Sequence, residues 1–165
     1  LLSRRQRQMC IRDSYRDMLT GLYNRNRYIE RLEAYKQVQD QQIGAIYIDL
    51  NGLKKVNDEQ GHRAGDELIV RAAGTIAGIF AEDAYRVGGD EFVVILLDVS
   101  REDFARKTEQ LRRQMQENSV DASIGGVWQA STENLEDLLR LADENMYREK
   151  KRYYSQADAA RKPES

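Results

Sequence analysis

The chain has 165 residues and a formal net charge of −2, and 33% of its residues are charged. This length fits one domain with a hydrophobic core of its own. Because the charges nearly cancel, no field of the whole chain would recruit nucleic acid or an anionic membrane, and an anionic substrate must be held locally. The single cysteine, Cys10, excludes an internal disulfide, and no apolar run approaches the roughly 20 residues that cross a bilayer. These features favour a cytoplasmic location.

The two ends of the chain are expected to lie outside the domain. The first residue is Leu1 rather than Met, which indicates a fragment. Residues 1–14 are rich in arginine, so a basic arm that binds nucleic acid is one interpretation, whereas a signal peptide is excluded because there is no apolar stretch. We favour a non-domain leader, because RRQRQMCIRDS resembles translated sequencing-adapter sequence. Residues 155–165 are small and polar, which predicts a disordered tail and leaves residues 15–154 as the domain.

Apolar periodicity predicts the elements of the first half. A helix should begin after Asn24, which can cap it, and end near Gln39. Residues 43–50 are an apolar run without alternation, which is typical of a central strand covered by helices on both faces. After a short turn or helix, an apolar stripe predicts a helix over residues 64–80.

The next elements are a hairpin and another helix. Residues 84–87 and 92–97 are predicted to be the two arms of a β-hairpin. Ser100 should cap a helix that runs to about Asn118, because Asp103 follows three residues later, close to a capping box.

The last strand and helix complete the predicted fold. Residues 122–128 alternate as a strand, and Asn134 should cap a helix through about Arg152. The resulting order predicts an α/β (α+β) fold with a ferredoxin-like, mainly antiparallel sheet flanked by helices. A right-handed crossover makes the first two core strands parallel, so both end at one edge of the sheet. The last helix should climb back to that edge and bring Lys150 within reach of a bound phosphate.

Acidic residues gather where these two strands end. Asp49 ends the first strand, and Asp90 and Glu91 follow Gly88-Gly89 in the hairpin turn, where glycine can take positive φ and lets a ligand approach the backbone. A Mg²⁺ site for a nucleotide takes one or two carboxylates plus phosphates, and Leu50 can add a carbonyl. Alone, Asp49 is a strand-end acid or a cap, and the hairpin is an ordinary turn. Two acidic sites at one edge favour metal and phosphate.

Polar residues after the first strand are candidates for contacts with a base or a phosphate. A carboxylate with a carboxamide, such as Asp66 with Asn57, can read guanine, although Asn57 could be a turn residue and Asp66 a cap of the next helix. Lys54 could neutralise charge on a transferred phosphoryl group, but a lysine after a strand is most often just solvated. His62, the only histidine, could be a general base, although a structural or base-stacking role is favoured.

Together these motifs resemble the GGDEF family, the diguanylate cyclases. The resemblance implies a nucleotide-cyclase-type fold and a bacterial signalling output domain that condenses two GTP into cyclic di-GMP and releases two pyrophosphates. Two such domains would form a catalytic homodimer, each holding one GTP. The matching motifs, in order, are Asp17-x-Leu19-Thr20-Gly21-Leu22-x-Asn24-Arg25, Asp49 to Asp58, Gly61-His62-x-x-Gly65-Asp66, Gly88-Gly89-Asp90-Glu91-Phe92, Ser123-Ile124-Gly125 and Ala142-Asp143-x-x-Met146-Tyr147-x-x-Lys150.

The resemblance also implies a role for each site residue. The metal, Mg²⁺ or alternatively Mn²⁺, would be held by Asp49, the Leu50 carbonyl and Asp90. Asp90 would also accept a proton, Glu91 would support the metal cluster, and Lys54 would stabilise the transition state. The substrate-binding residues would be Asn57, His62, Asp66, Gly88, Gly89 and Lys150.

Three positions depart from the family pattern. Asn51 stands where a second Asp is usual, and activity should survive. The product-inhibition motif Arg-x-x-Asp falls on residues 79–82 and lacks its arginine, so no high-affinity inhibition is expected there. Lys150 is followed by Lys151-Arg152-Tyr153-Tyr154 rather than Gly-Arg-Asn, which leaves open which basic residue meets the phosphates. The competing interpretations are a catalytically silent domain that acts as a GTP-binding or protein-interaction module, and a generic α/β domain without a nucleotide.

Overall fold

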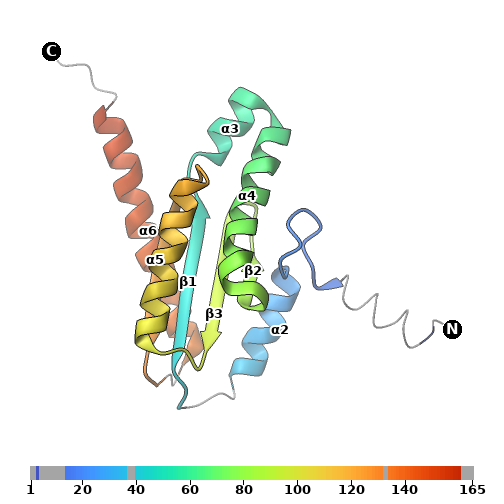
Figure 1. The fold of residues 1–165 in the computed structure, drawn as a ribbon, viewed down its shortest axis with the longest axis vertical. Helices are drawn as coiled ribbons and strands as arrows, with labels where there is room; N and C mark the ends of the chain where they lie inside the picture. The colour runs from blue at the N-terminus through green and yellow to red at the C-terminus, as the bar shows by residue number, and fades with distance from the viewer. Residues whose placement is uncertain (1–2, 4–13, 37–39, 132–133, 161–165) are drawn as a thin grey trace.

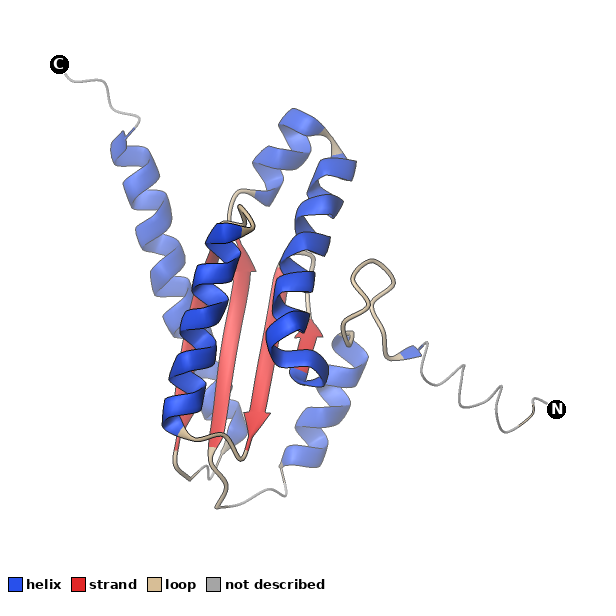
Figure 2. Cartoon of the chain, viewed as in Figure 1, coloured by secondary structure: helices blue, strands red, loops and turns tan. Residues whose placement is uncertain are grey.

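A four-stranded sheet forms the centre of the molecule, with helices on both faces (Figures 1 and 2). The computed structural model describes residues 3, 14–36, 40–131 and 134–160. Helices α4 and α5 cover one face of the sheet, and α2 and α6 cover the other. The elements are α2 (Arg25–Tyr35), β1 (Ile43–Leu50), α3 (Leu53–Gln60), α4 (His62–Phe80), the 3₁₀ turn η1 (Ala81–Asp83), β2 (Ala84–Arg86), β3 (Glu91–Leu97), α5 (Arg101–Glu117), β4 (Ala122–Gln129) and α6 (Leu135–Ala160).

The strands lie in the order β2-β3-β1-β4, and all neighbours are antiparallel. Since β1 and β2 are both antiparallel to β3, they run in the same direction and end at the same edge, as predicted. Asp49 pairs with Glu91 in the ladder of β1 and β3. The Leu50 N–H donates to the Asp90 carbonyl at 3.0 Å, so the end of β1 meets the hairpin turn directly. The predicted sheet, with its flanking helices, is confirmed.

Strand β1 is buried on both faces, which explains its apolar run without alternation. Ile46 and Ile48 belong to the core under α4 and α5, whereas Ile43 and Ala45 belong to the core under α2 and α6. Burying an aliphatic side chain of this size contributes about 1.5–3 kcal/mol. Because side chains alternate along a strand, Asp49 falls on the face that α6 covers.

Helix α6 lies directly on the backbone of β4 at Gly125. A Cβ atom at this position would overlap the amide of Met146 and the carbonyl of Ala142. Ala142 is itself completely buried. The absence of a side chain at Gly125 therefore sets how closely α6 approaches the sheet, and with it where the residues after Met146 lie.

The predicted helix caps are confirmed. The side chain of Asn24 accepts from the Arg27 N–H at 3.1 Å, and that of Ser100 accepts from the Asp103 N–H at 3.1 Å. Asn134 accepts from the N–H of Glu136 at 2.9 Å. Each cap satisfies a donor that the first turn of a helix leaves without an intrahelical partner.

Several helix boundaries differ from the prediction. Helix α4 begins at His62 after Gly61, so Asp66 lies in its second turn and is not its cap. Helix α6 continues to Ala160, so residues 155–160 are helical rather than a disordered tail. Helix α2 ends at Tyr35, and the predicted end near Gln39 lies outside the described residues. Most of the predicted leader and the last five residues also lie outside them.

Candidate active site

Three carboxylates meet where β1 ends and the hairpin turns; we call Asp49, Asp90 and Glu91 the acidic edge. Asp49 is buried, with 4% of its surface exposed, and faces Glu91 across the ladder. Helix α6 returns to this edge, and the Lys150 ammonium lies 2.8 Å from Asp49 Oδ1. The structure therefore brings Lys150 to the predicted edge, while its contact with a phosphate stays a prediction.

The charges at the acidic edge are only partly balanced. Burial raises the pKa of Asp49 and the charge of Asp90 adds to this, although the hydrogen bond from Lys150 opposes both. Desolvation of its carboxyl raises the pKa of Glu91, and the charges of Asp49 and Asp90 raise it further. Burial lowers the pKa of Lys150, but the hydrogen bond and charge of Asp49 outweigh it, so the net shift is upward. A further cation would relieve this repulsion.

The donors of the acidic edge suit a hard divalent cation. They are all oxygen atoms, which Mg²⁺ and Mn²⁺ prefer. Among residues 14–36, 40–131 and 134–160, no group of three or more His, Cys, Asp and Glu side chains is arranged to hold a metal ion by itself. Magnesium usually fills its remaining positions with water and substrate phosphates, so two carboxylates and a carbonyl are a sufficient protein contribution.

The hairpin turn before Asp90 is held by its own backbone. The N–H groups of Val87 and Gly88 both donate to the Glu91 carbonyl, at 3.0 and 3.3 Å. A Cβ at Gly88 would lie 2.5 Å from the Glu91 carboxylate, so glycine makes room for that side chain. Neither Gly88 nor Gly89 has positive φ, so the turn does not use the left-handed conformation that glycine permits. Positive φ occurs instead at Gly52, between β1 and α3.

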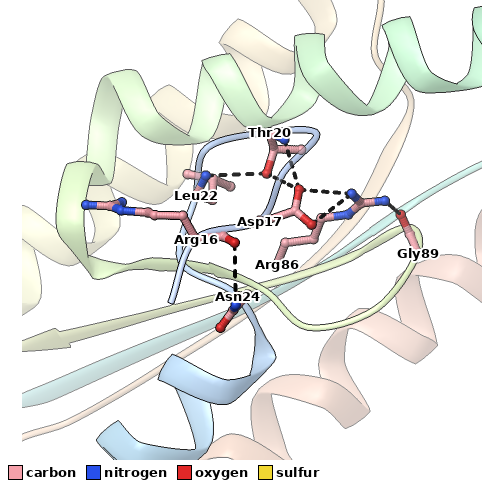
Figure 3. Close-up of polar contacts among 7 residues, drawn as sticks. All are labelled: Arg16, Asp17, Thr20, Leu22, Asn24, Arg86 and Gly89. Atoms are coloured by element: carbon pink, nitrogen blue, oxygen red, sulfur yellow. Dashed lines mark hydrogen bonds and ion pairs between the residues drawn. The ribbon is translucent and has the colours of Figure 1, made fainter. Parts of the chain in front are cut away.

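Arg86 fastens this hairpin to the segment before α2 (Figure 3). Its guanidinium donates to Asp17 Oδ2 at 3.0 Å and to the Gly89 carbonyl at 2.8 Å. The same carboxylate accepts from the hydroxyl of Thr20 at 2.7 Å. Burial raises the pKa of Asp17, but the hydrogen bonds from Thr20 and Arg86 prevail and lower it. Sequence analysis did not single out Arg86, because its partner Asp17 is far away in the chain.

The residues predicted to read guanine gather at the α3–α4 junction. His62 and Asp66 are exposed and lie one turn apart at the start of α4. A Cβ at Gly65 would overlap the side-chain oxygen of Asn57, so glycine is needed for α3 to approach α4 this closely. Asn57 is thereby brought beside the turn that carries Asp66. Lys54 is exposed in the first turn of α3.

A cleft of about 700 Å³ joins the acidic edge to α3. Its walls are α3 and the last turns of α6, and they include Lys54, Asp90 and Lys150. A second cleft of about 720 Å³ lies between α5 and β4, next to Phe104 and Trp128. It contains none of the predicted site residues, so chemistry rather than size distinguishes the first cleft.

Asn51 does not belong to the acidic edge. It is 5% exposed, and its side-chain oxygen accepts from the Ser123 hydroxyl at 2.9 Å. A charged aspartate here would be buried beside Asp49 and would add to the repulsion among the carboxylates. The amide avoids this cost, and it leaves the three acids of the edge unchanged.

The diguanylate cyclase, GGDEF domain family matches residues 14–156. The chain belongs to this family. The GGDEF domain thus accounts for nearly the whole of the described structure, from Ser14 to the last turns of α6. No helix in the described part of the chain is both long and apolar enough to span a membrane.

Several known proteins resemble the GGDEF domain. It is 35% identical over 146 residues to the probable diguanylate cyclase DgcJ of Escherichia coli, covering 82% of this chain and 29% of the relative. It is 32% identical over 163 residues to the diguanylate cyclase DgcS of Shewanella oneidensis, covering 91% of this chain and 54% of the relative. Among solved structures, the diguanylate cyclase SiaD of Pseudomonas aeruginosa, in complex with its activator SiaC, aligns with a TM-score of 0.77 and 28% identity, covering 90% of this chain and 62% of that chain. The chain therefore spans about a third to a half of these two curated relatives.

Proposed function

We propose that this GGDEF domain is an active diguanylate cyclase that condenses two GTP molecules into cyclic di-GMP. The observation that carries the proposal is the cleft that brings Asp90 and Lys150 together with Lys54 of α3, while the Lys150 ammonium also donates to Asp49 at 2.8 Å. Negative groups for a metal and positive groups for phosphates lie at one end of it. A carboxamide and a carboxylate suited to guanine lie on α3 and α4. The relatives named as diguanylate cyclases support the same reaction.

The proposed metal residues are Asp49, Asp90 and the Leu50 carbonyl. When bound, Mg²⁺ or Mn²⁺ would neutralise phosphate charge and help to orient the triphosphate. Glu91 would keep the edge negative enough to attract the cation. Removing one electrostatic group should lower the rate by on the order of 10²–10³, and removing a metal ligand should lower it further.

The residues of the chain have distinct tasks in the proposed reaction. The 3′-hydroxyl oxygen of one GTP attacks the α-phosphorus of the other, and its proton passes to Asp90. The bond between the α-phosphorus and the bridging oxygen breaks, and pyrophosphate leaves with the electron pair. Lys54 and Lys150 would balance the charge on the phosphates. Asn57 and Asp66 would select guanine, since bases that lack its donors leave these groups unpaired, at a cost of about 10⁴–10⁵ in specificity.

The reaction requires two GGDEF domains, because each is proposed to hold one GTP. A homodimer that brings two acidic edges together is therefore part of the proposal. At low concentration, the isolated domains would seldom meet, and turnover would be slow even with an intact site.

The test is a concentration series of the purified protein with GTP and Mg²⁺, in which cyclic di-GMP and pyrophosphate are separated by chromatography. Specific activity should rise with protein concentration. D90N should abolish turnover, whereas D98N, an exposed aspartate after the other end of β3, should leave it unchanged. GTP binding without product at any concentration would favour a silent regulatory module instead, and no GTP binding would favour a generic α/β domain.

A further inference from the structure

Helix α6 continues past Lys150 for more than two turns (Figure 1), and this extension includes Tyr153 and Tyr154. Tyr153 and Tyr154 follow Lys150 by three and four residues, so all three share one face of the helix. That face forms a wall of the cleft that also contains Lys54 and Asp90. The sequence at these positions departs from the usual family ending, and no role follows from the resemblance.

Tyr154 contacts the segment that follows Leu50 directly, and Tyr153 is linked to it through Asp121. The Tyr154 hydroxyl accepts from the Gly52 N–H at 3.3 Å. The Tyr153 hydroxyl donates to the Asp121 carboxylate at 3.2 Å, and the Asp121 carbonyl accepts from the Asn51 N–H at 2.8 Å. The two rings pack edge to face, with centroids 5.2 Å apart and an angle of 89°. The pair therefore reaches both Asn51 and Gly52, directly or through Asp121.

The geometry of Gly52 makes its amide a suitable anchor. Gly52 precedes the first residue of α3 and has φ of 73°, a conformation that only glycine adopts without strain. Its N–H belongs to the donors that the start of a helix leaves without an intrahelical partner. The Tyr154 hydroxyl supplies that partner from the other wall of the cleft.

We propose that Tyr153 and Tyr154 are positioning residues, a tyrosine clasp, that fix the last turns of α6 and thereby aim Lys150 at the phosphate end of the site. This inference rests on the proposed function. A lysine has a long flexible stem, so the place of its helix limits where the ammonium can act. Misplacing such a group by about 1 Å can cost up to about 10²-fold in rate. The clasp also holds Gly52 beside Leu50, whose carbonyl is a proposed metal ligand.

The test removes the two hydroxyls and keeps the rings, in the variant Y153F/Y154F. Binding of GTP, GDP and GMP is measured by titration calorimetry with Mg²⁺ present. Affinity for GTP should fall on the order of tenfold, as expected when the contact of Lys150 with a phosphate is weakened, whereas affinity for GMP should stay unchanged. A loss of affinity that depends on the number of phosphates would indicate that the clasp positions Lys150, whereas a general loss of stability would weaken the binding of all three nucleotides. Y147F, an exposed tyrosine of the same helix, is the matched control and should change none of the affinities.

A second comparison asks whether the clasp acts through Lys150. In the K150M background, adding Y153F/Y154F should cost no further GTP affinity, because the group that the clasp positions is already gone. Equal losses for GTP and GMP, additive losses with K150M, or no loss at all would overturn the clasp while leaving the proposed function standing. A wild-type protein that binds no guanine nucleotide would instead overturn the proposed function, and the clasp with it.

Discussion

The acidic edge lies where β1 ends, before α3, whereas the α3–α4 junction lies after α3, and the two regions are built in different ways. The acidic edge depends on contacts between segments far apart in the chain: Asp49 from β1, Asp90 from the hairpin and Lys150 from α6. The α3–α4 junction is made by neighbouring segments, and its residues His62 and Asp66 are exposed. A change in the packing of the whole domain should therefore disturb the first region, and a local change should disturb the second.

Of the variants that separate the two regions, G125A is expected to have the largest effect, and it should act on the acidic edge through the packing of α6. The new methyl group would overlap the backbone of α6 at Ala142 and Met146, and backbone cannot move aside without shifting the helix. We expect unfolding free energy to fall by about 3 kcal/mol or more, measured by urea denaturation, with weaker GTP binding because Lys150 moves away from Asp49. G74A is the control, since a Cβ there meets no atom within 4 Å. It should be neutral or stabilising by up to about 1 kcal/mol. Equal stability of the two variants would contradict the packing described here.

A smaller and more local effect is expected from G65A. Its Cβ would overlap only the Asn57 side chain and crowd Leu53, so Asn57 must turn aside. GTP affinity should fall about tenfold, while unfolding free energy changes by less than about 1 kcal/mol, because a flexible side chain can yield. GTP binding and urea denaturation, measured on the same preparation, show whether G65A affects affinity or stability. A large loss of stability with unchanged binding would mean that the junction is structural and does not read the base.

The ion pair between Asp17 and Arg86 should make the free energy of unfolding depend on pH. The pKa of Asp17 is lower in the folded protein than in the unfolded chain. The ion pair therefore stabilises the protein fully above the unfolded pKa of about 3.9, and this stabilisation is lost as the pH falls through the folded pKa. D17N should cost about 1–3 kcal/mol at pH 7, as expected for hydrogen bonds to a charged group. When urea denaturation is measured at a series of pH values, the difference in unfolding free energy between wild type and D17N should decrease only below about pH 4. A difference that decreases between pH 7 and 5 would assign the effect to another group.

The smallest expected effect concerns product inhibition. Glu82 stands at the end of the altered inhibition motif, and its carboxylate pairs with Arg16 at 2.8 Å. Cyclic di-GMP added at low micromolar concentration should therefore leave the rate unchanged, and E82A should behave like the wild type in this assay. Strong inhibition that disappears in E82A would show that the motif still binds product.

Local features of the fold were predictable, because their causes lie within a few residues. The helix caps are Asn24, Ser100 and Asn134, and each bonds an N–H group in the first turn of its helix. The apolar run of β1 predicted that this strand is buried on both faces. The end of α6 was not predictable in this way, since its polar residues gain support from β1 and α3, through Tyr154, rather than from their own sequence.

For the candidate site, the sequence predicted which acidic residues would lie together but only part of the geometry around them. Strand direction brought Asp49 and Asp90 together, because a right-handed crossover fixes it. The bond between Arg86 and Asp17 joins residues 69 positions apart, and nothing near either one indicates the other. The constraint on Gly88 was not predictable from the local sequence either, because it is the space taken by the Glu91 side chain.

The central place of β1 has a consequence for how the site opens in solution. Hydrogen exchange is slowest in strands paired on both sides and fastest at helix ends with few buried contacts. The amide of Asp49 lies in a strand paired with both β3 and β4, whereas Tyr154 lies near the exposed end of α6. The last turns of α6 can therefore open locally while the acidic edge stays folded, and the amides of the two regions should exchange on separate timescales.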